Sequence, residues 1–320
     1  MASSTPESGT SSLQGALPRS PAAEAAGESA MVVPAEWAPR PRRKVPLFVW
    51  ASAVFMLLTV LSAVLASVIS PYDPVRQALR ARLTDPTWFP KEGKRQYLLG
   101  TDHVGRDILS RVIHGSRVSL IVGFAAVIIG TLLGGSLGLL SGYAGGIVDE
   151  AIMLVADAQL AFPFILLAIG IIAVLGPSFA NLIIVVGISG WVTYARVIRA
   201  TVLSLKEREF VLAIRGLGGS TWRVLLTHIL PNTFSPLLVV ATLELARTII
   251  LESTLSFLGL GVQPPTPSWG GMMSEGREYL DSAWWISTFP GLVLMLTALV
   301  VSRVGDWLRD VLDPTLRGTS

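Results

Sequence analysis

Residues Glu207 to Asn232 read EREFVLAIRGLGGSTWRVLLTHILPN, and this stretch decides the fold. Both halves repeat apolar residues at the i, i+3, i+4, i+7 spacing of an amphipathic helix. The two stripes are Phe210, Ala213, Ile214 and Leu217, then Trp222, Leu225, Leu226 and Ile229. Gly218 stands where a helix takes a left-handed C-terminal stop, and Ser220 is a candidate N-cap. Pro231 is expected to end the second helix. The sequence therefore predicts a hairpin of two short helices around a glycine corner.

The composition places this hairpin in a membrane protein. Of the 320 residues, 51% are hydrophobic and only 15% are charged, and the mean hydropathy is +0.60. Soluble domains carry about 25% charged residues, and a spanning helix needs ~20 mostly apolar ones. We predict an all-α polytopic membrane protein with about six transmembrane helices. The expected spans are 45–70, 120–143, 153–175, 179–194, 236–257 and 284–304.

Basic residues predict the orientation of the chain. The cluster from Arg40 to Lys44 directly precedes the first span, and Lys and Arg gather on cytoplasmic loops. An even number of spans then returns the C-terminus to the cytoplasm. The polar segment 71–117 is also rich in basic residues although it is predicted to be external. The rule is weaker for long loops, so we expect both termini to be cytoplasmic.

The chain is expected to divide into four parts. A disordered cytoplasmic tail covers 1–39, where Ala, Ser, Pro and Gly dominate and no apolar period appears. The first span and an external segment with an interfacial helix cover 40–116. The transmembrane core covers 117–306, with the hairpin at 207–232, and a cytoplasmic tail covers 307–320.

The interfacial helix is expected from one apolar face in the external segment. The face consists of Ile108, Leu109, Val112 and Ile113. A helix lying in the outer membrane interface accounts for this face. A contact for a delivering binding protein is the alternative.

Glycines recur every fourth residue in the second span. They are Gly130, Gly134, Gly138 and Gly142. Small residues at this spacing form one ribbon along a helix and allow another helix to approach closely. We expect this ribbon to be a helix-packing surface. Pro163 and Pro290 are expected to kink their spans.

Charged side chains inside spans are candidates for a translocation path, because burial in lipid is costly unless a partner or cavity compensates. Glu244 and Arg247 are three residues apart and share a helix face. They either line a path or pair with each other at a subunit interface. Asp157, near Gln159 in the third span, indicates a polar path residue or an interfacial turn.

Catalysis by this chain is not expected. There is no Cys, and His103, His114 and His228 share no ligand spacing, so we expect no metal site. No Ser/His/Asp set stands out either. The hairpin is better explained as a docking element, with one face against its own spans and one face free. A helix pair lying on lipid is the alternative.

The opening stretch resembles the EAA loop of permease subunits of binding-protein-dependent ABC transporters. The matching residues are Glu209, Ala213, Arg215, Gly218, Leu230 and Pro231, within a loop that also contains Trp222. Ile214 stands where a second alanine is usual, and His228 where an isoleucine is often found. Neither departure removes the corner or the Leu-Pro end.

Three further segments resemble the dipeptide/oligopeptide importer family (DppC/OppC-like). They are LLGTDHVGRDILSRVIHGSRVSL (98–120), LESTLSFLGLGVQPPTPSWGGMM (251–273) and GDWLRDVLDPTLR (305–317). The resemblance covers about 40–317, with the segments in the same order. The match of the second segment, which contains Glu252, implies a structural or gating role for that residue.

The resemblance implies a type I ABC importer permease fold in the cytoplasmic (inner) membrane of a bacterium or archaeon. It implies a homologous second permease, two ATPase subunits, an extracytoplasmic binding protein and a peptide substrate. The chain lacks a G-x-x-x-x-G-K-[ST] phosphate loop, so ATP and Mg are expected on the partner ATPases and no cofactor on this chain.

Other functions stay open from the sequence. The same architecture also imports nickel chelates or sugars in this family branch. An ion-coupled secondary transporter would use Glu244, yet it would not need a coupling hairpin. A membrane enzyme would need a catalytic cluster that the sequence does not display.

Overall fold

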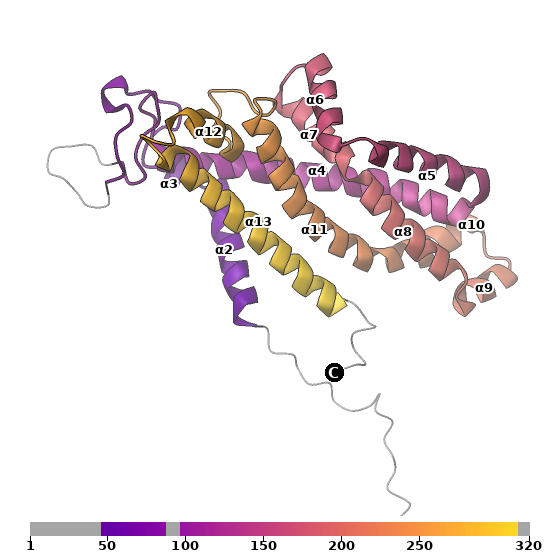
Figure 1. The fold of residues 1–320 in the computed structure, drawn as a ribbon. Helices are drawn as coiled ribbons and strands as arrows, with labels where there is room; N and C mark the ends of the chain where they lie inside the picture. Colours follow the sequence, from indigo (N-terminus) through magenta and orange to yellow (C-terminus); the bar gives the residue numbers. More distant parts are fainter. Residues whose placement is uncertain (1–45, 88–96, 313–320) are drawn as a thin grey trace, which may run out of the picture. The chain divides into compact units, whose positions relative to one another are not determined.

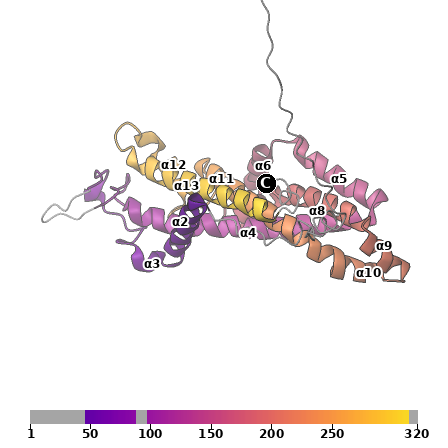
Figure 2. The ribbon, with the colours of Figure 1, turned by 90° about the horizontal axis from the view of Figure 1, so that it is seen from below.

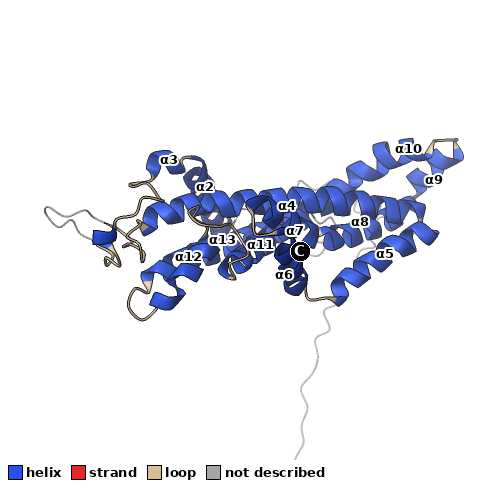
Figure 3. Ribbon diagram, turned by 90° about the horizontal axis from the view of Figure 1, so that it is seen from above, coloured by secondary structure: helices blue, strands red, loops and turns tan. Residues whose placement is uncertain are grey.

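The computed structural model describes residues 46–87 and 97–312. The predicted tail 1–39 and residues 313–320 lie outside this part of the chain. The described residues are helical apart from turns and one isolated β-bridge between Thr101 and Asp107 (Figure 3). The prediction of an all-α fold is confirmed.

The helices follow each other along the chain as drawn in Figure 1. Before the long helix α4 stand α2 (Leu47–Val64), α3 (Ala66–Ile69) and the 3-10 turn η2 (Leu79–Ala81). The middle of the chain contains α4 (Ile108–Ala144), α5 (Gly146–Ala161), α6 (Phe164–Leu175), α7 (Phe179–Ser189) and α8 (Trp191–Lys206). The rest contains α9 (Glu209–Gly216), α10 (Thr221–Arg223), the π-helix η3 (Val224–Ile229), α11 (Leu230–Phe257), α12 (Trp269–Gly276), η4 (Arg277–Tyr279) and α13 (Trp285–Leu312).

Five helical stretches of the described chain are long and apolar enough to cross a membrane. They are Leu47–Val64, Ile108–Ala144, Phe179–Lys206, Thr221–Phe257 and Trp285–Leu312. The bent pair α5 and α6 makes a sixth if the pair is taken as one span. The prediction of about six spans is therefore confirmed, although most of the span boundaries differ from the predicted ones and the third span is bent.

The third predicted span is broken rather than kinked. The axes of α5 and α6 meet at 91° on either side of Phe162 and Pro163. Phe162 is extended, with φ −104° and ψ 137°, because the proline ring clashes with a helical conformation of the residue before it. Pro163 becomes the N-cap of α6. Pro290, by contrast, is accommodated inside α13.

The segment predicted as an interfacial helix before the second span forms the first turns of α4. Asp107 caps the helix, and its Oδ2 accepts from the backbone N–H of Ser110 at 2.8 Å. Ile108 and Arg111 are buried, so this end packs inside the protein. The predicted boundary between 116 and 117 falls in the middle of a continuous helix.

The glycine ribbon of α4 lies against α7 and α8. A Cβ on Gly134 would stand 2.2 Å from the carbonyl oxygen of Trp191, and one on Gly138 would stand 2.4 Å from that of Ala195. Gly130 meets the ring of Tyr194 and Gly142 meets Val202 at similarly short distances. No side chain fits between the two backbones, so α4 and α8 approach each other through glycine.

A buried ionic cluster holds the N-terminal end of α4. This ionic cluster consists of Asp102, Arg106, Arg111 and Glu275. Arg106 Nε lies 2.6 Å from Asp102 Oδ2, and Arg111 Nη1 lies 2.5 Å from the same oxygen and 2.7 Å from Glu275 Oε2. Arg106 Nη2 also reaches Glu275 Oε2 at 2.7 Å. The cluster ties the loop before α4 to α12.

The pKa of Asp102 is lowered within this cluster. Burial by itself would raise it, but the charges of Arg111 and Arg106 outweigh burial. The backbone N–H groups of Arg106 and Val104 add to this by donating to Oδ1 at 2.9 Å. Asp102 is therefore held as a carboxylate.

α4 connects the ionic cluster to the hairpin. Its 37 residues extend about 55 Å at 1.5 Å per residue. Figures 1 and 2 both show α4 running from the neighbourhood of α3 and α12 to that of α9 and α10. α11 packs on both α4 and α13, and residues of α4, α11 and α13 share an apolar core with Trp269.

Candidate functional site

The hairpin 207–232 is built around the corner that the sequence predicts. α9 ends at Gly216, and Gly218 follows with φ +82°, a left-handed conformation that costs other residues more than glycine. The Ser220 side chain accepts from the backbone N–H of Arg223 and caps α10. The backbone N–H of Gly219 closes the turn on the Ile214 carbonyl at 2.9 Å.

One face of the hairpin packs on the end of α8. The shared core consists of Ile198, Val202, Val211, Val224, Leu225 and Ile229, all of them buried. Val211 is the single residue of α9 that is fully covered. The hairpin is thus fixed to α8 through one residue of its first leg and several of its second.

The other face of the hairpin exposes large apolar side chains. Leu217 is 89% exposed and Trp222 is 69% exposed. Phe210, Leu212 and Leu226 are also exposed, between 42% and 53%. These five residues form the free face of the hairpin. A free apolar face of this kind marks an interaction surface.

The predicted stripes differ from this arrangement by about one position. Phe210 and Leu217 were expected beside Ile214, yet Val211 is the buried residue of α9 and Phe210 belongs to the free face. In the second leg Leu225 and Ile229 are buried as their stripe predicts, but Trp222 and Leu226 are exposed. Both sides of the hairpin are apolar, so periodicity alone could not say which one packs.

The charged residues of the hairpin lie at its surface. Glu209 is the first residue of α9 and is exposed, as is Ala213 one turn later. The Arg215 guanidinium lies 5.5 Å from the centre of the Tyr143 ring, and its Nη2 lies 3.5 Å from the Tyr143 hydroxyl. Arg215 therefore joins α9 to the last turn of α4.

Pro231 does not end the second leg, and this prediction is wrong. α10, η3 and α11 form one continuous helical stretch from Thr221 to Phe257. Leu230 and Pro231 are the first residues of α11, directly after the π-helical segment η3. Pro231 has no backbone N–H to donate to the preceding turn. Wider π turns relieve the ring's conflict with the preceding turn. Pro236 also lies inside α11. The hairpin is thus joined directly to a span.

Glu244 and Arg247 contact each other in α11. Arg247 Nη1 lies 3.2 Å from Glu244 Oε2. The Glu244 side chain is 10% exposed and that of Arg247 is 51% exposed. The two residues do pair with each other, as the interface alternative requires. The Arg247 guanidinium also reaches the surface of the chain, as a role in a translocation path requires.

Glu252 is fully buried between α4 and α11. Its carboxylate accepts from the hydroxyls of Ser256 at 2.7 Å, Ser119 at 2.9 Å and Ser253 at 3.2 Å. Ser119 belongs to α4, so the group joins two spans. The geometry supports a structural role and not a contact with a passing substrate.

Asp157 belongs to a seam between α5 and α8. Arg196 Nη2 donates to Asp157 Oδ1 at 2.5 Å, and both side chains are about half exposed. Nearby, Trp191 Nε1 donates to Gln159 Oε1 at 2.5 Å. These contacts hold the broken span to the helix that leads into the hairpin.

A third pair in this seam was missed from the sequence. Arg199 donates from Nε and Nη2 to the two carboxylate oxygens of Asp149, at 2.5 and 2.6 Å. Ser141 Oγ donates to the same carboxylate at 2.5 Å. The two charged residues lie 50 positions apart. The one signal in the sequence is that Asp149 and Arg199 have opposite charges and both lie near the ends of predicted spans.

One group of potential metal ligands occurs among the described residues. Asp102, His103 and Glu275 have ligand atoms within 4.8 Å of one another. Two of the three are carboxylates that already bind Arg106 and Arg111. Two guanidinium groups at the same oxygens oppose a cation by charge, so this group does not fit a metal site.

Residues 134–318 match the family described as "Binding-protein-dependent transport system inner membrane component". The chain belongs to this family of ABC transporter permeases. The match includes the whole hairpin, and permease subunits of this kind have no catalytic site and bind no cofactor of their own. The resemblance stated from the sequence is confirmed.

Two relatives place the permease more closely. It is 43% identical to the "Di/tripeptide transport system permease protein DppC" of Pseudomonas aeruginosa, over 83% of this chain and 88% of that protein. It is 39% identical to the "Glutathione transport system permease protein GsiD" of Pectobacterium atrosepticum, over 83% of this chain and 87% of that one. Both alignments extend beyond the family match.

A solved structure shares the fold of the permease. An inward-facing form of the MetNI methionine ABC transporter matches with a TM-score of 0.52 and 16% identity. The match covers 64% of this chain and 98% of the matched chain. The described helices are therefore those of an ABC transporter permease, in a multi-pass inner membrane protein.

Proposed function

We propose that the permease is the membrane subunit of an importer for di- or tripeptides and that the hairpin couples it to an ATPase. The proposed substrate class rests on the two relatives, a di/tripeptide and a glutathione transport permease, since glutathione is itself a tripeptide. The free face carries the coupling role, because Leu217 and Trp222 are exposed at a glycine corner with no covering element in the described chain.

The connections of the hairpin support a mechanical role. Its second leg runs without interruption into α11, and its first leg packs through Val211 on α8. A displacement imposed on the free face therefore moves two spans together. Asp149 and Asp157 link α8 to α5, so the broken span follows. ATP binding and hydrolysis in the partner would shift the spans between two access states.

The assembly we propose has a homologous second permease, two ATPase subunits and an extracytoplasmic binding protein. Large apolar residues of α6 support the contact with a second permease. Val174 is 85% exposed and Leu166 is 64% exposed. The free face would seat in the ATPase, and the delivering protein would contact the end of the permease that contains the ionic cluster. Family membership implies the ATPase and the binding protein.

We place both termini in the cytoplasm. Support comes from the basic cluster Arg40 to Lys44 before the first span and from the arginines of the hairpin loop. Because the chain lacks cysteine, single cysteines test this cleanly. A cysteine at Thr266 should react with an impermeant thiol reagent in intact cells. One at Thr221 should be protected, and its labelling would contradict the orientation.

Among the charged residues of the spans, we assign Arg247 with Glu244 to the translocation path. The half-exposed guanidinium could meet a peptide carboxylate while Glu244 keeps it oriented. We assign Glu252 to helix packing, on its burial among three serines. Arg247→Gln should lower dipeptide uptake by the assembled importer, and unchanged uptake would remove Arg247 from the path.

The central experiment uses the assembled importer in proteoliposomes with labelled dialanine. Uptake should require ATP and the binding protein, and the permease alone should show no ATPase activity. Trp222→Ala should reduce ATPase co-purification strongly while the permease inserts normally. Trp284→Ala is the matched control, since Trp284 is 48% exposed but lies outside the hairpin. Uptake driven by a proton gradient without ATP would contradict the proposal.

A further inference from the structure

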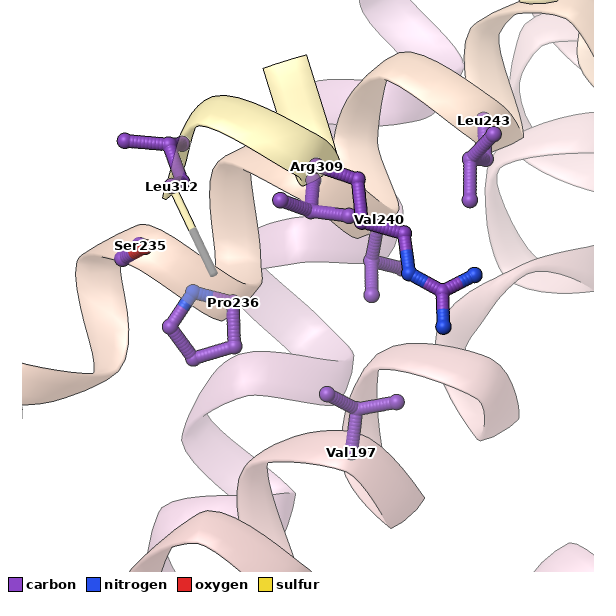
Figure 4. Close-up of a pocket in the computed structure, with 8 residues that line it drawn as sticks. Val197, Ser235, Pro236, Val240, Leu243, Arg309 and Leu312 are labelled. Carbon is purple, nitrogen blue, oxygen red and sulfur yellow. The ribbon is translucent and has the colours of Figure 1, made fainter. Parts of the chain in front are cut away.

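A groove opens between α8, α11 and α13 on the chain. Its volume is about 390 Å³, within the range of small-molecule sites. Figure 4 shows side chains from all three helices directed into it. The apolar wall is made of Val197, Pro236, Val239, Val240, Leu243 and Leu312. Ser235 and Arg309 are the polar side chains of the lining.

Arg309 extends over this groove. In Figure 4 its guanidinium lies between Leu243 and Val197, away from the backbone of α13. Among the described residues it has neither an ion-pair nor a hydrogen-bond partner. Asp306 and Asp310 flank it on α13 without pairing with it, and Glu244 on α11 is occupied by Arg247. The groove therefore combines an apolar wall with one unpaired cation.

We propose that the groove binds an anionic phospholipid, with its phosphate on Arg309 and an acyl chain along the wall. A guanidinium binds phosphate oxygens through two parallel hydrogen bonds. Basic pockets between spanning helices at the cytoplasmic side select anionic headgroups. All three helices belong to candidate spans, so lipid is the medium that surrounds the groove.

The composition of the wall favours a lipid over a peptide segment. A peptide brings an N–H and a carbonyl with each residue, and each costs free energy when it is buried without a partner. Among the described residues of the lining, Ser235 is the one with a hydroxyl, and it could satisfy few of these groups. An acyl chain needs no partner. The proposal is independent of which substrate the importer carries.

The position of the groove gives the bound lipid a structural consequence. α8 and α11 both continue into the hairpin, and α13 closes the other side. A lipid wedged among them would fix the spacing of the two helices that the hairpin moves. It would therefore act on the coupling elements and not on the opposite end of α4.

The first test measures lipid retention. The assembled importer is purified in detergent, equilibrated with equal phosphatidylglycerol and phosphatidylcholine, and analysed by native mass spectrometry. Wild type should retain phosphatidylglycerol preferentially. Arg309→Gln should reduce that retention roughly tenfold or more, the loss expected for a charged hydrogen-bonded contact. Arg303→Gln, on the exposed surface of the same helix, should match wild type. Equal retention by Arg309→Gln would overturn the proposal.

Two further variants locate the occupant. Val239→Trp fills the groove and keeps Arg309, so it should also lower phosphatidylglycerol retention; wild-type retention would exclude the acyl chain from the groove. Benzoylphenylalanine in place of Val239 should give an adduct with the mass of phosphatidylglycerol after irradiation. An adduct with the second permease, with residues 313–320 of this chain or with a peptide substrate would overturn the proposal in favour of that occupant.

Discussion

The two ends of α4 differ in how their side chains are partnered. At the N-terminal end, the ionic cluster pairs two carboxylates with two guanidinium groups. Its members come from the loop before α4, from α4 itself and from α12. At the C-terminal end, Tyr143 meets Arg215 of a hairpin whose apolar side chains stay exposed. The charges of the first end are paired within one chain, whereas the second end leaves an apolar face uncovered in the described chain.

The comparison teaches where mutations should act. A change in the ionic cluster leaves a charge buried inside the permease, so the cost falls on folding. A change in the free face removes nothing that the permease packs against, so the cost falls on assembly. The glycine ribbon between them keeps α4 and α8 in close contact, so a change there should weaken the packing of the two helices.

Arg111→Met should have the largest effect on stability. Arg111 is 1% exposed, and removing one partner from a buried ion pair typically costs about 3–5 kcal/mol. Thermal unfolding of the purified permease followed by tryptophan fluorescence measures this cost. Arg277→Met, at an exposed position beside the same helix α12, should change little. Equal melting temperatures for both variants would show that the ionic cluster does not hold this end.

Gly134→Ala should come next, through the contact of α4 with α8. The new Cβ would stand 2.2 Å from the Trp191 carbonyl oxygen, and overpacking of this kind costs about 1–3 kcal/mol. Gly135→Ala is the matched control, because its Cβ meets only the Leu237 side chain at 3.7 Å. Both variants are compared by thermal unfolding. A destabilised Gly135→Ala with a normal Gly134→Ala would contradict the packing.

Gly218→Ala should have a smaller and local effect. An L-residue in the left-handed conformation costs about 1–2 kcal/mol, and a Cβ there meets nothing within 4 Å. Gly216→Ala also enters open space, but φ at Gly216 is not positive. We expect Gly218→Ala to weaken ATPase co-purification while the spans unfold at the normal temperature. Gly216→Ala should co-purify normally; if the two behave alike, strain at the corner does not matter.

The smallest expected effect is the pH response of the ionic cluster. The pKa of Asp102 is lowered in the folded chain, whereas the pKa of an aspartate in an unfolded chain is about 3.9. The stabilisation is therefore complete above about pH 4 and is lost as the pH falls toward the folded pKa. The melting-temperature gap between wild type and Asp102→Asn should be constant from about pH 7 to 5 and should narrow below about pH 4. A gap that changes between pH 7 and 5 would point to another group.

Local chemistry made part of the molecule predictable from the sequence. The positive φ of Gly218 and the cap at Ser220 follow from the residue types alone. The spacing of the α4 glycines likewise predicts a close helix contact, although not that α7 and α8 provide it. The number of spans followed from apolar length.

Features that depend on distant contacts were not predictable. Glu275 stands 164 residues from Arg111, and no local pattern links them. The second leg shows the same limit, because Pro231 is a helix stop by local rules and the π-helix before it is stabilised by burial of Val224 and Ile229. Which side of α9 packs was undecidable, since both sides are apolar.

The π-helical segment from Val224 to Ile229 also sets the rotation of the second leg of the hairpin about the helix axis relative to α11. One residue more or less in a helix rotates everything beyond it by about 100°. Deleting one residue here would restore an ordinary helix and turn Trp222 away from its present direction relative to Glu244. Such a permease would retain the four residues of the free face that precede this segment and still present the wrong side to its ATPase. Co-purification should then fail while insertion and span packing persist.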